Sequence, residues 1–65
     1  MARAEIGSIL EITDNDTNII VEEGYMEVFE GTPREVESLI PRTHLQREVK
    51  AMYYSKLRNA LVLEI

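Results

Sequence analysis

The chain has 65 residues, of which 45% are hydrophobic and 29% are charged, and its net charge is −5. This length allows one domain, residues 1–65, with a small core, and the composition is that of a folded chain and not of a disordered one. The absence of cysteine excludes disulfides and cysteine-based metal sites. Oligomerisation is the remaining usual stabiliser of so small a fold, so we expect a homodimer.

No apolar run reaches the length of a membrane span, and Arg3 and Glu5 precede the first apolar stretch, which is unlike a signal peptide. We therefore expect a cytoplasmic protein without a membrane partner. The charge is uneven, because residues 1–41 hold ten acids against two arginines (net −8) and residues 42–65 hold five basic residues against two acids (net +3). This asymmetry indicates either a charged partner surface or simply a solvated face.

Residues 4–12, AEIGSILEI, alternate between apolar and polar side chains, which predicts a half-buried strand. Residues 13–18, TDNDTN, carry the Asp and Asn side chains that favour tight turns. Asp14 and Asp16 are two residues apart, as in calcium loops, but the glycine and the distal glutamate of that motif are missing. A hairpin turn is therefore the better interpretation.

Residues 19–30 predict the returning strand of this hairpin. Gly24 lies inside the run and indicates a β-bulge or a second tight turn. Because such a break exchanges the faces on which later side chains lie, the sequence leaves open whether Val28 or Phe29 faces the core.

Several local signals agree on a short helix over residues 33–40. Thr32 is a favourable N-cap, Pro33 occupies the first helical position, Glu35 completes a capping box, and Pro41 ends the helix. The apolar face of this helix is formed by Val36, Leu39 and Ile40.

The segment 44–58 is ambiguous, because its apolar residues fit a helix, with a second capping box from Thr43 to Gln46, and also fit a strand. We favour a strand over 49–57, a turn near Arg58–Asn59 and a last strand over 61–65. The apolar last strand must be paired or covered, and pairing across a homodimer would achieve this.

The predicted fold class is therefore α+β. It consists of an N-terminal β-hairpin, a short capped helix, and one or two further strands (or a second helix) that form a small antiparallel sheet.

The sequence does not predict an enzyme. His44 is the only histidine, and no serine has a recognisable nucleophile context. Glu35 and Glu37 are two residues apart and do not converge on one helix face. The GTP at 31–33 lacks the glycine and lysine of a phosphate loop. We expect no catalytic residue, no metal and no cofactor.

The basic C-terminal part offers an alternative function. Tyr53 and Tyr54 lie among basic residues, a mixture that can track a nucleic-acid backbone and stack bases. The whole protein is acidic and no helix-turn-helix or sheet-platform signature is present, so nucleic acid is the less favoured partner. The candidate residues for this alternative are Arg47, Lys50, Lys56 and Arg58.

A protein partner is favoured instead, because four glutamates and two apolar residues cluster where the second strand leads into the capped helix. An apolar patch with an acidic rim suits docking into a basic groove, and carboxylates can occupy a DNA-binding cleft through the electrostatics that DNA uses. The candidate partner-binding residues are Glu27, Glu30, Glu35, Val36, Glu37 and Ile40.

The segments YMEVFEG (25–31) and EVESLI (35–40), preceded by the acidic turn TDNDTN, resemble the small acidic uracil-DNA glycosylase inhibitors of phi29-like phages, and more generally small phage-encoded ββα proteins. The resemblance implies a homodimer that inhibits a host DNA-processing or defence protein in the host cytoplasm. The family's pocket residues are aromatic where this chain has aliphatic ones, and the family has no counterpart of the last strand.

On this resemblance Glu27 and Glu37 would face the enzyme, and Val36 and Ile40 would line a pocket for an apolar enzyme side chain. The sequence thus favours a small acidic module that binds and inhibits or modulates a protein partner, with the acids steering it and the apolar pair supplying affinity. A small nucleic-acid-binding regulator and a structural subunit of a larger assembly are the alternatives.

Overall fold

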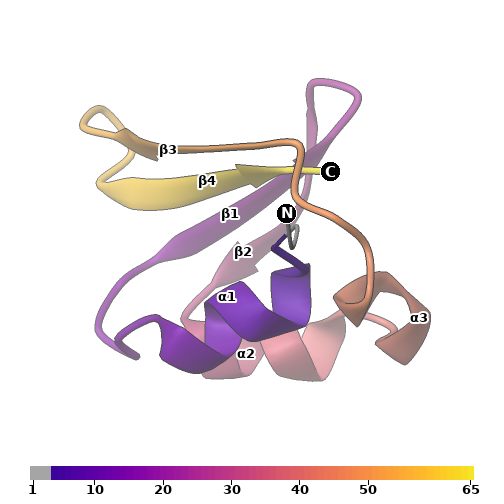
Figure 1. Cartoon of the computed structure of the whole chain (residues 1–65). Coiled ribbons are helices and arrows are strands. Elements are labelled where there is room, and N and C mark those ends of the chain that lie inside the picture. The colour runs from indigo at the N-terminus through magenta and orange to yellow at the C-terminus, as the bar shows by residue number, and fades with distance from the viewer. Residues whose placement is uncertain (1–3) are drawn as a thin grey trace.

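The computed structural model describes residues 4–65, which form helices and strands in a small α+β domain (Figure 1). In chain order the elements are α1 (Ile6–Ile12), β1 (Ile19–Glu23), β2 (Met26–Gly31), α2 (Pro33–Leu39), α3 (Arg42–Leu45), β3 (Ala51–Ser55) and β4 (Ala60–Glu64). The predicted α+β class is confirmed. No helix in residues 4–65 is long and apolar enough to cross a membrane.

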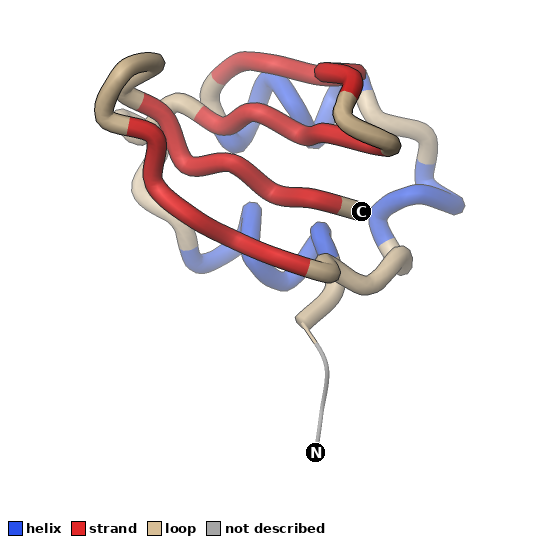
Figure 2. Tube along the Cα trace, turned by 90° about the horizontal axis from the view of Figure 1, so that it is seen from above, coloured by secondary structure: helices blue, strands red, loops and turns tan. Residues whose placement is uncertain are grey.

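The four strands form one sheet in the order β2-β1-β4-β3. Two antiparallel hairpins, β1–β2 and β3–β4, lie side by side, and their inner strands β1 and β4 run parallel. The sheet is therefore mixed, and the prediction of an antiparallel sheet is wrong. The helices lie on one face of the sheet (Figures 1 and 2). No helix within residues 4–65 covers the opposite face, which is called the outer face below.

Alternation along the two central strands distributes their side chains between the two faces. Ile19 and Val21 of β1 and Leu63 of β4 are fully buried on the helix side. The core there consists of Ile6, Ile9, Leu10, Ile19, Val21, Val36, Ile40, Leu63 and Ile65. A smaller cluster of Ile20, Ala60 and Val62 is buried on the outer face.

The N-terminal segment is a helix, so the strand predicted over 4–12 is wrong. Ile6, Ile9 and Leu10 lie at positions i, i+3 and i+4 and are buried. Ile12, which strand alternation would place on the same face as Ile6 and Leu10, is 85% exposed. A segment this short and this aliphatic fits both periodicities. The packing of these three buried side chains against the sheet favours the helix, since so short a helix draws its stability from tertiary contacts.

Because α1 is a helix, the loop 13–18 joins a helix to a strand and is not a hairpin turn. The Asp14 carbonyl accepts a hydrogen bond from the Thr17 N–H, and its side chain accepts one from the Asp16 N–H. The Asn15 side chain accepts a hydrogen bond from the Arg34 N–H in the first turn of α2. The turn chemistry of this loop is thus used to satisfy backbone donors.

The capped helix is confirmed. The Thr32 Oγ1 accepts a hydrogen bond from the Glu35 N–H and the Glu35 Oε1 accepts one from the Thr32 N–H, so both halves of the capping box are present. Pro33 opens α2, and Val36 and Ile40 pack into the core. Leu39, which the apolar pattern grouped with them, is 61% exposed.

The run 19–30 is interrupted by a tight turn at Gly24, which is one of the two alternatives predicted there; the other was a β-bulge. Gly24 and Tyr25 are its two central residues, and both have positive φ (60° and 68°), as a two-residue type I′ hairpin turn demands. A bulge in the β1–β2 pairing follows, after which Phe29 is half-buried against the core and Val28 is exposed. The structure thereby answers the question that the sequence left open.

The segment after Pro41 contains one turn of helix, α3, and then the β3–β4 hairpin. The favoured strand–turn–strand prediction is confirmed, with a shorter β3 and with β4 displaced by one residue. The capping box proposed for Thr43 and Gln46 does not form, because Pro41 is the N-cap of α3 and makes no side-chain hydrogen bond. β4 is an inner strand with neighbours on both sides. The last strand therefore needs no homodimer to pair it.

Candidate interaction surface

The six predicted partner-binding residues do not gather on one surface. Glu27 and Glu30 lie on β2, where their register partners Glu22 and Ile20 place them on the outer face. Val36 is fully buried on the helix side and Ile40 is 4% exposed, so neither side chain is available to a partner in this conformation. The helix side and the outer face are opposite sides of the sheet (Figure 1).

The two glutamates of α2 have different environments. Glu35 is committed to the capping box at the start of the helix. Glu37 is exposed and lines two shallow depressions beside Arg34, one of them shared with Arg42. Glu37 is thus the one member of the predicted set on α2 that is open to solvent and without a capping role.

The two glutamates on β2 are paired with one arginine from the far side of the sheet. Arg58, in the β3–β4 turn, forms a two-pronged ion pair with Glu27, and its Nη2 lies 3.3 Å from Glu30 Oε2. To reach β2 from this turn the side chain must pass over β4 and β1. Ile20 and Val62 lie on this face without a helix over them, yet they are only 1% and 3% exposed. The pairs of Arg58 with Glu27 and Glu30 thus join the β3–β4 turn to β2 across this face.

Tyr53 occupies the other part of the outer face. It lies opposite Val62 on β4 and is 47% exposed. Partial burial raises the pKa of the Tyr53 hydroxyl, and the nearby carboxylates of Glu22 and Glu64 raise it further. Tyr53 is therefore a neutral hydrogen-bond donor at neutral pH, and its neighbours are acids and not an accessible nucleic-acid platform.

Two of the four residues proposed for nucleic-acid binding are engaged in ion pairs. Arg58 is bound as described, and Arg47 Nη1 lies 2.5 Å from Glu23 Oε2 at the end of β1. Lys50 and Lys56 form no ion pair with any residue in 4–65, and they flank β3 at its two ends. The structure thus separates the basic set into two paired arginines and two unpaired lysines.

The Arg47–Glu23 pair gives stability a pH dependence that can be measured. The hydrogen bond and the charge of Arg47 lower the pKa of Glu23 below its ordinary value. The folded state therefore binds fewer protons than the unfolded state in this range, so the stabilisation is present above the unfolded glutamate pKa and is lost as pH falls through the lower folded pKa.

We expect wild type to unfold at a higher temperature than Arg47→Met at neutral pH, and the difference to shrink as pH is lowered below about 4.3. Thermal unfolding monitored by circular dichroism between neutral and acid pH measures both proteins. If the difference in unfolding temperature between the two proteins stays constant over this pH range, the Arg47–Glu23 ion pair is not its cause.

The two edge strands of the sheet differ in how they are protected. β2 carries a bulge and the paired acids Glu27 and Glu30, and bulges and charges are the devices by which sheet edges avoid unwanted pairing. β3, AMYYS, contains no bulge, charge or proline over its five residues. Ala4 and Glu5 pair with Val49 and Glu48 just before β3 begins, and no residue in 4–65 pairs with the outer edge of β3 itself.

The register shows which backbone groups this edge offers. The N–H groups of Leu61 and Ile65 donate to carbonyls of the β1 side, so the alternate residues of β4 face β3. These are Ala60, Val62 and Glu64, which lie opposite Ser55, Tyr53 and Ala51. Since antiparallel strands exchange hydrogen bonds at every second residue, the N–H and C=O groups of Met52 and Tyr54 point away from the sheet.

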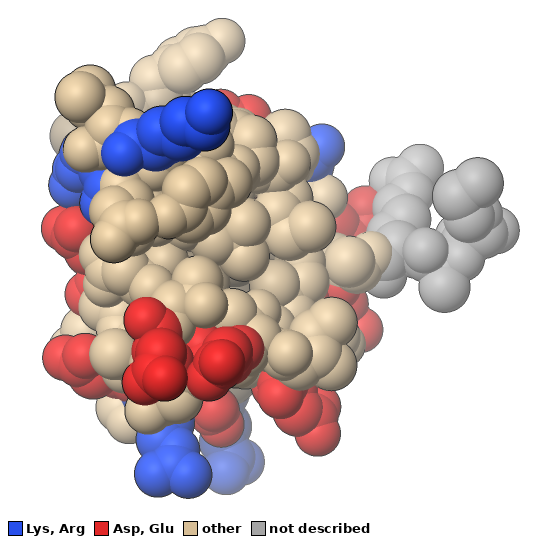
Figure 3. Space-filling model, turned by 90° about the vertical axis from the view of Figure 1, so that its left-hand side faces the viewer, with Lys and Arg blue, Asp and Glu red and all other residues tan. Residues whose placement is uncertain are grey.

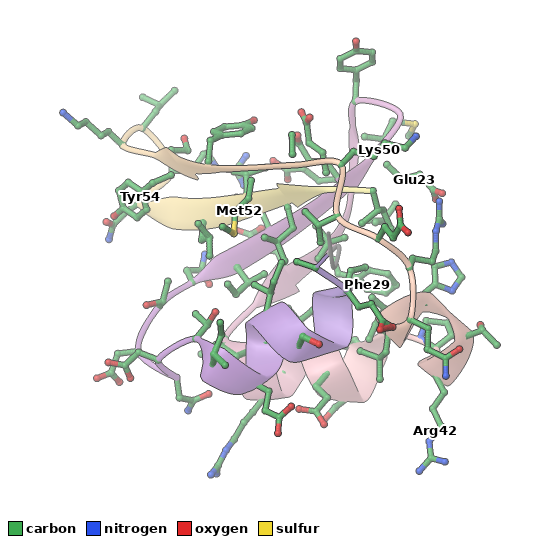
Figure 4. The ribbon with its side chains drawn as sticks, in the orientation of Figure 1. Glu23, Phe29, Arg42, Lys50, Met52 and Tyr54 are labelled. Carbon is green, nitrogen blue, oxygen red and sulfur yellow. The ribbon has the colours of Figure 1, made fainter. Side chains whose placement is uncertain are left out.

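The side chains of the same two residues form an apolar surface on the helix side. Met52 and Tyr54 are 56% and 54% exposed, and Figure 4 shows both extending from β3 towards the side where the helices lie. Figure 3 views the molecule from the side on which the β3–β4 turn lies in Figure 1. The surface there is largely uncharged between basic side chains above and acidic side chains below. We call the backbone edge of Ala51–Ser55, together with the side chains of Met52 and Tyr54, the β3 edge.

Sequence reasoning placed Tyr53 and Tyr54 in a strand but did not identify this edge, because which strand is outermost depends on the long-range parallel pairing of β1 with β4. The signal that could have found it is local. A five-residue strand without charge, flanked by Lys50 and Lys56, is the pattern of an edge protected only at its ends.

No group of His, Asp and Glu side chains in residues 4–65 is arranged to hold a metal ion. Comparison of the chain with protein-family models, with curated proteins and with solved structures finds no match. The β3 edge is therefore the feature on which a functional hypothesis rests.

Proposed function

We propose that this protein is a protein-binding module that accepts an extended segment of its partner as an additional strand along the β3 edge. The observation that carries the proposal is the contrast between the two outer strands, since β2 is bulged and acidic whereas β3 is regular, uncharged and exposed. Strand addition of this kind draws affinity from main-chain hydrogen bonds and specificity from alternate side chains. A partner whose segment is held in this way is inhibited or modulated when it needs that segment elsewhere.

The exposed side chains of the β3 edge support this function. Met is a common residue of adaptable binding surfaces, and Tyr combines a large apolar area with a polar end. An added strand would cover both side chains from the edge and would satisfy the outward backbone groups of Met52 and Tyr54. The acids Glu27 and Glu30 would contribute to steering and not to direct contact, because Arg58 already binds them.

The alternative partner is single-stranded nucleic acid, for which Lys50 and Lys56 provide two cations and Tyr54 provides one aromatic ring on the helix side, since Tyr53 lies among acids on the outer face. The pairing of Arg47 and Arg58 with glutamates weakens this alternative, because it removes two of the four cations that the sequence offered. The homodimer remains a prediction, and β3 provides one place where two copies could pair.

A pull-down with the tagged protein from bacterial lysate, at low and moderate salt and with nuclease added to one half, tests the proposal. We expect one protein to be retained in both halves, with modest loss at the higher salt. Retention that disappears with nuclease would instead support the nucleic-acid alternative, for which strong salt dependence is expected. Recovery of no partner under any condition would contradict a binding module.

A further inference from the structure

Within residues 4–65, a lysine stands at each end of the β3 edge, where a strand added there would meet it. Lys50 precedes β3 and Lys56 follows it, and neither forms an ion pair with a residue in 4–65. Lys50 lines a small depression that Glu22 and Glu64 also line, whereas Lys56 lies in the β3–β4 turn. Six residue steps separate the two lysines, which corresponds to about 20 Å along an extended chain.

These lysines disfavour a second copy of the chain as the occupant. The outward groups of Met52 and Tyr54 allow two copies to pair antiparallel around Tyr53, with Met52 of one copy opposite Tyr54 of the other. The same register places Lys50 opposite Lys56 at both ends of the new pairing. Like charges that face each other across paired strands are destabilising.

The same two lysines favour an acidic occupant. We infer that the segment accepted by the β3 edge is an extended stretch of about seven residues with a carboxylate near each end and apolar side chains at alternate positions between them. The carboxylates would lie beside Lys50 and Lys56. The apolar side chains would lie on the helix side, against Met52 and Tyr54. This inference rests on the proposed function and adds the chemistry of the partner to it.

Three capped peptides of seven residues test the inference. The acidic peptide has Glu at positions 1 and 7, Val at 3 and 5, and Thr at 2, 4 and 6. The basic peptide has Lys in place of both Glu. The third peptide is the acidic one with Pro at positions 4 and 5, so that an N–H facing the β3 edge is lost whether the peptide runs antiparallel (position 5) or parallel (position 4) to β3. Each is titrated into the isotope-labelled full-length protein, and backbone amide shifts are followed by NMR.

We expect the acidic peptide to shift the amides of Met52 and Tyr54 and to bind at least about fivefold more tightly than the basic peptide, with the ratio falling as salt is added. Lys50→Gln with Lys56→Gln is expected to remove this ratio and to leave the location of the shifts unchanged. The proline peptide is expected to bind much more weakly than its parent.

The contradicting outcomes separate the inference from the proposed function. Equal binding of the acidic and basic peptides at Met52 and Tyr54 would overturn the acidic chemistry and leave strand addition intact. Shifts of these amides that depend on protein concentration without peptide would identify a second copy as the occupant and overturn the inference. Absence of shifts at β3 with every peptide would count against strand addition itself.

Discussion

Met52→Pro is expected to abolish retention of the protein partner, with a loss of at least about tenfold, while the domain stays folded. The Met52 N–H points away from the sheet, so proline removes a donor that the β3–β4 hairpin does not use. Proline is tolerated at such solvent-facing edge positions. It denies an incoming strand one hydrogen bond, and its ring obstructs the approach. The pull-down and a circular-dichroism melt measure the two effects separately.

Met52→Val is the matched control, because it shortens the same side chain and keeps the backbone donor. We expect it to retain the partner, with at most a small reduction. Equal retention by wild type, Met52→Val and Met52→Pro would place the contact surface elsewhere. Glu37, the exposed glutamate of α2 that takes no part in the capping box, would then be the next residue to replace.

Leu63→Ala is expected to destabilise the domain by about 3 kcal/mol, because it removes buried methyl groups and leaves a cavity. Leu63 is fully buried on the helix side between β1 and β3. A domain of this size has on the order of 3–10 kcal/mol of total stability, so this single loss is a large fraction of it. Chemical denaturation followed by circular dichroism measures the change.

Leu57→Ala is the matched control for this prediction, since it makes the same substitution at a side chain that is 95% exposed in the β3–β4 turn. We expect the free energy of unfolding to change by no more than about 0.5 kcal/mol. Similar losses for the two variants would mean that β4 does not occupy the centre of the sheet. A partner pull-down with Leu57→Ala also tests whether this exposed turn contributes to binding.

The capped helix could be predicted because all of its determinants are local. The cap residue, the proline at the first position and the glutamate three residues after the cap act within one turn of chain, and the structure contains both hydrogen bonds of the box. The β3–β4 hairpin was also within reach, because the alternation over 49–57 and the apolar run at the end need only one turn between them. Its boundaries moved by one or two residues.

The N-terminal element could not be predicted in the same way. In AEIGSILEI the set Ile6, Leu10 and Ile12 satisfies a strand and the set Ile6, Ile9 and Leu10 satisfies a helix, so periodicity does not separate them. The choice depends on the sheet beneath, which exists only when β1 pairs in parallel with β4, some forty residues later in the chain. The long-range pairing therefore determines both the type of the first element and the position of the edge strands.

The candidate site shows the same limit. The clustering of Glu27, Glu30, Glu35 and Glu37 in sequence indicated one acidic surface, but strand alternation and the helix turn distribute these residues over opposite sides of the sheet. Arg58, thirty-one residues from Glu27, then forms ion pairs with two of them. A charge cluster in sequence becomes a surface only when the fold keeps its members together, and here it does not.

Within residues 4–65 no strand pairs with the outer edge of β3, and the proposed function requires that a partner completes this edge. Amide hydrogen exchange, read residue by residue in the free protein and in its complex with the captured partner, tests this claim most directly. We predict that the amides of Met52 and Tyr54 exchange rapidly in the free protein, whereas the amide of Tyr53 is protected there. The amides of Met52 and Tyr54 are expected to become protected in the complex. Exchange at Met52 and Tyr54 that stays rapid in a complex formed at full occupancy would contradict it.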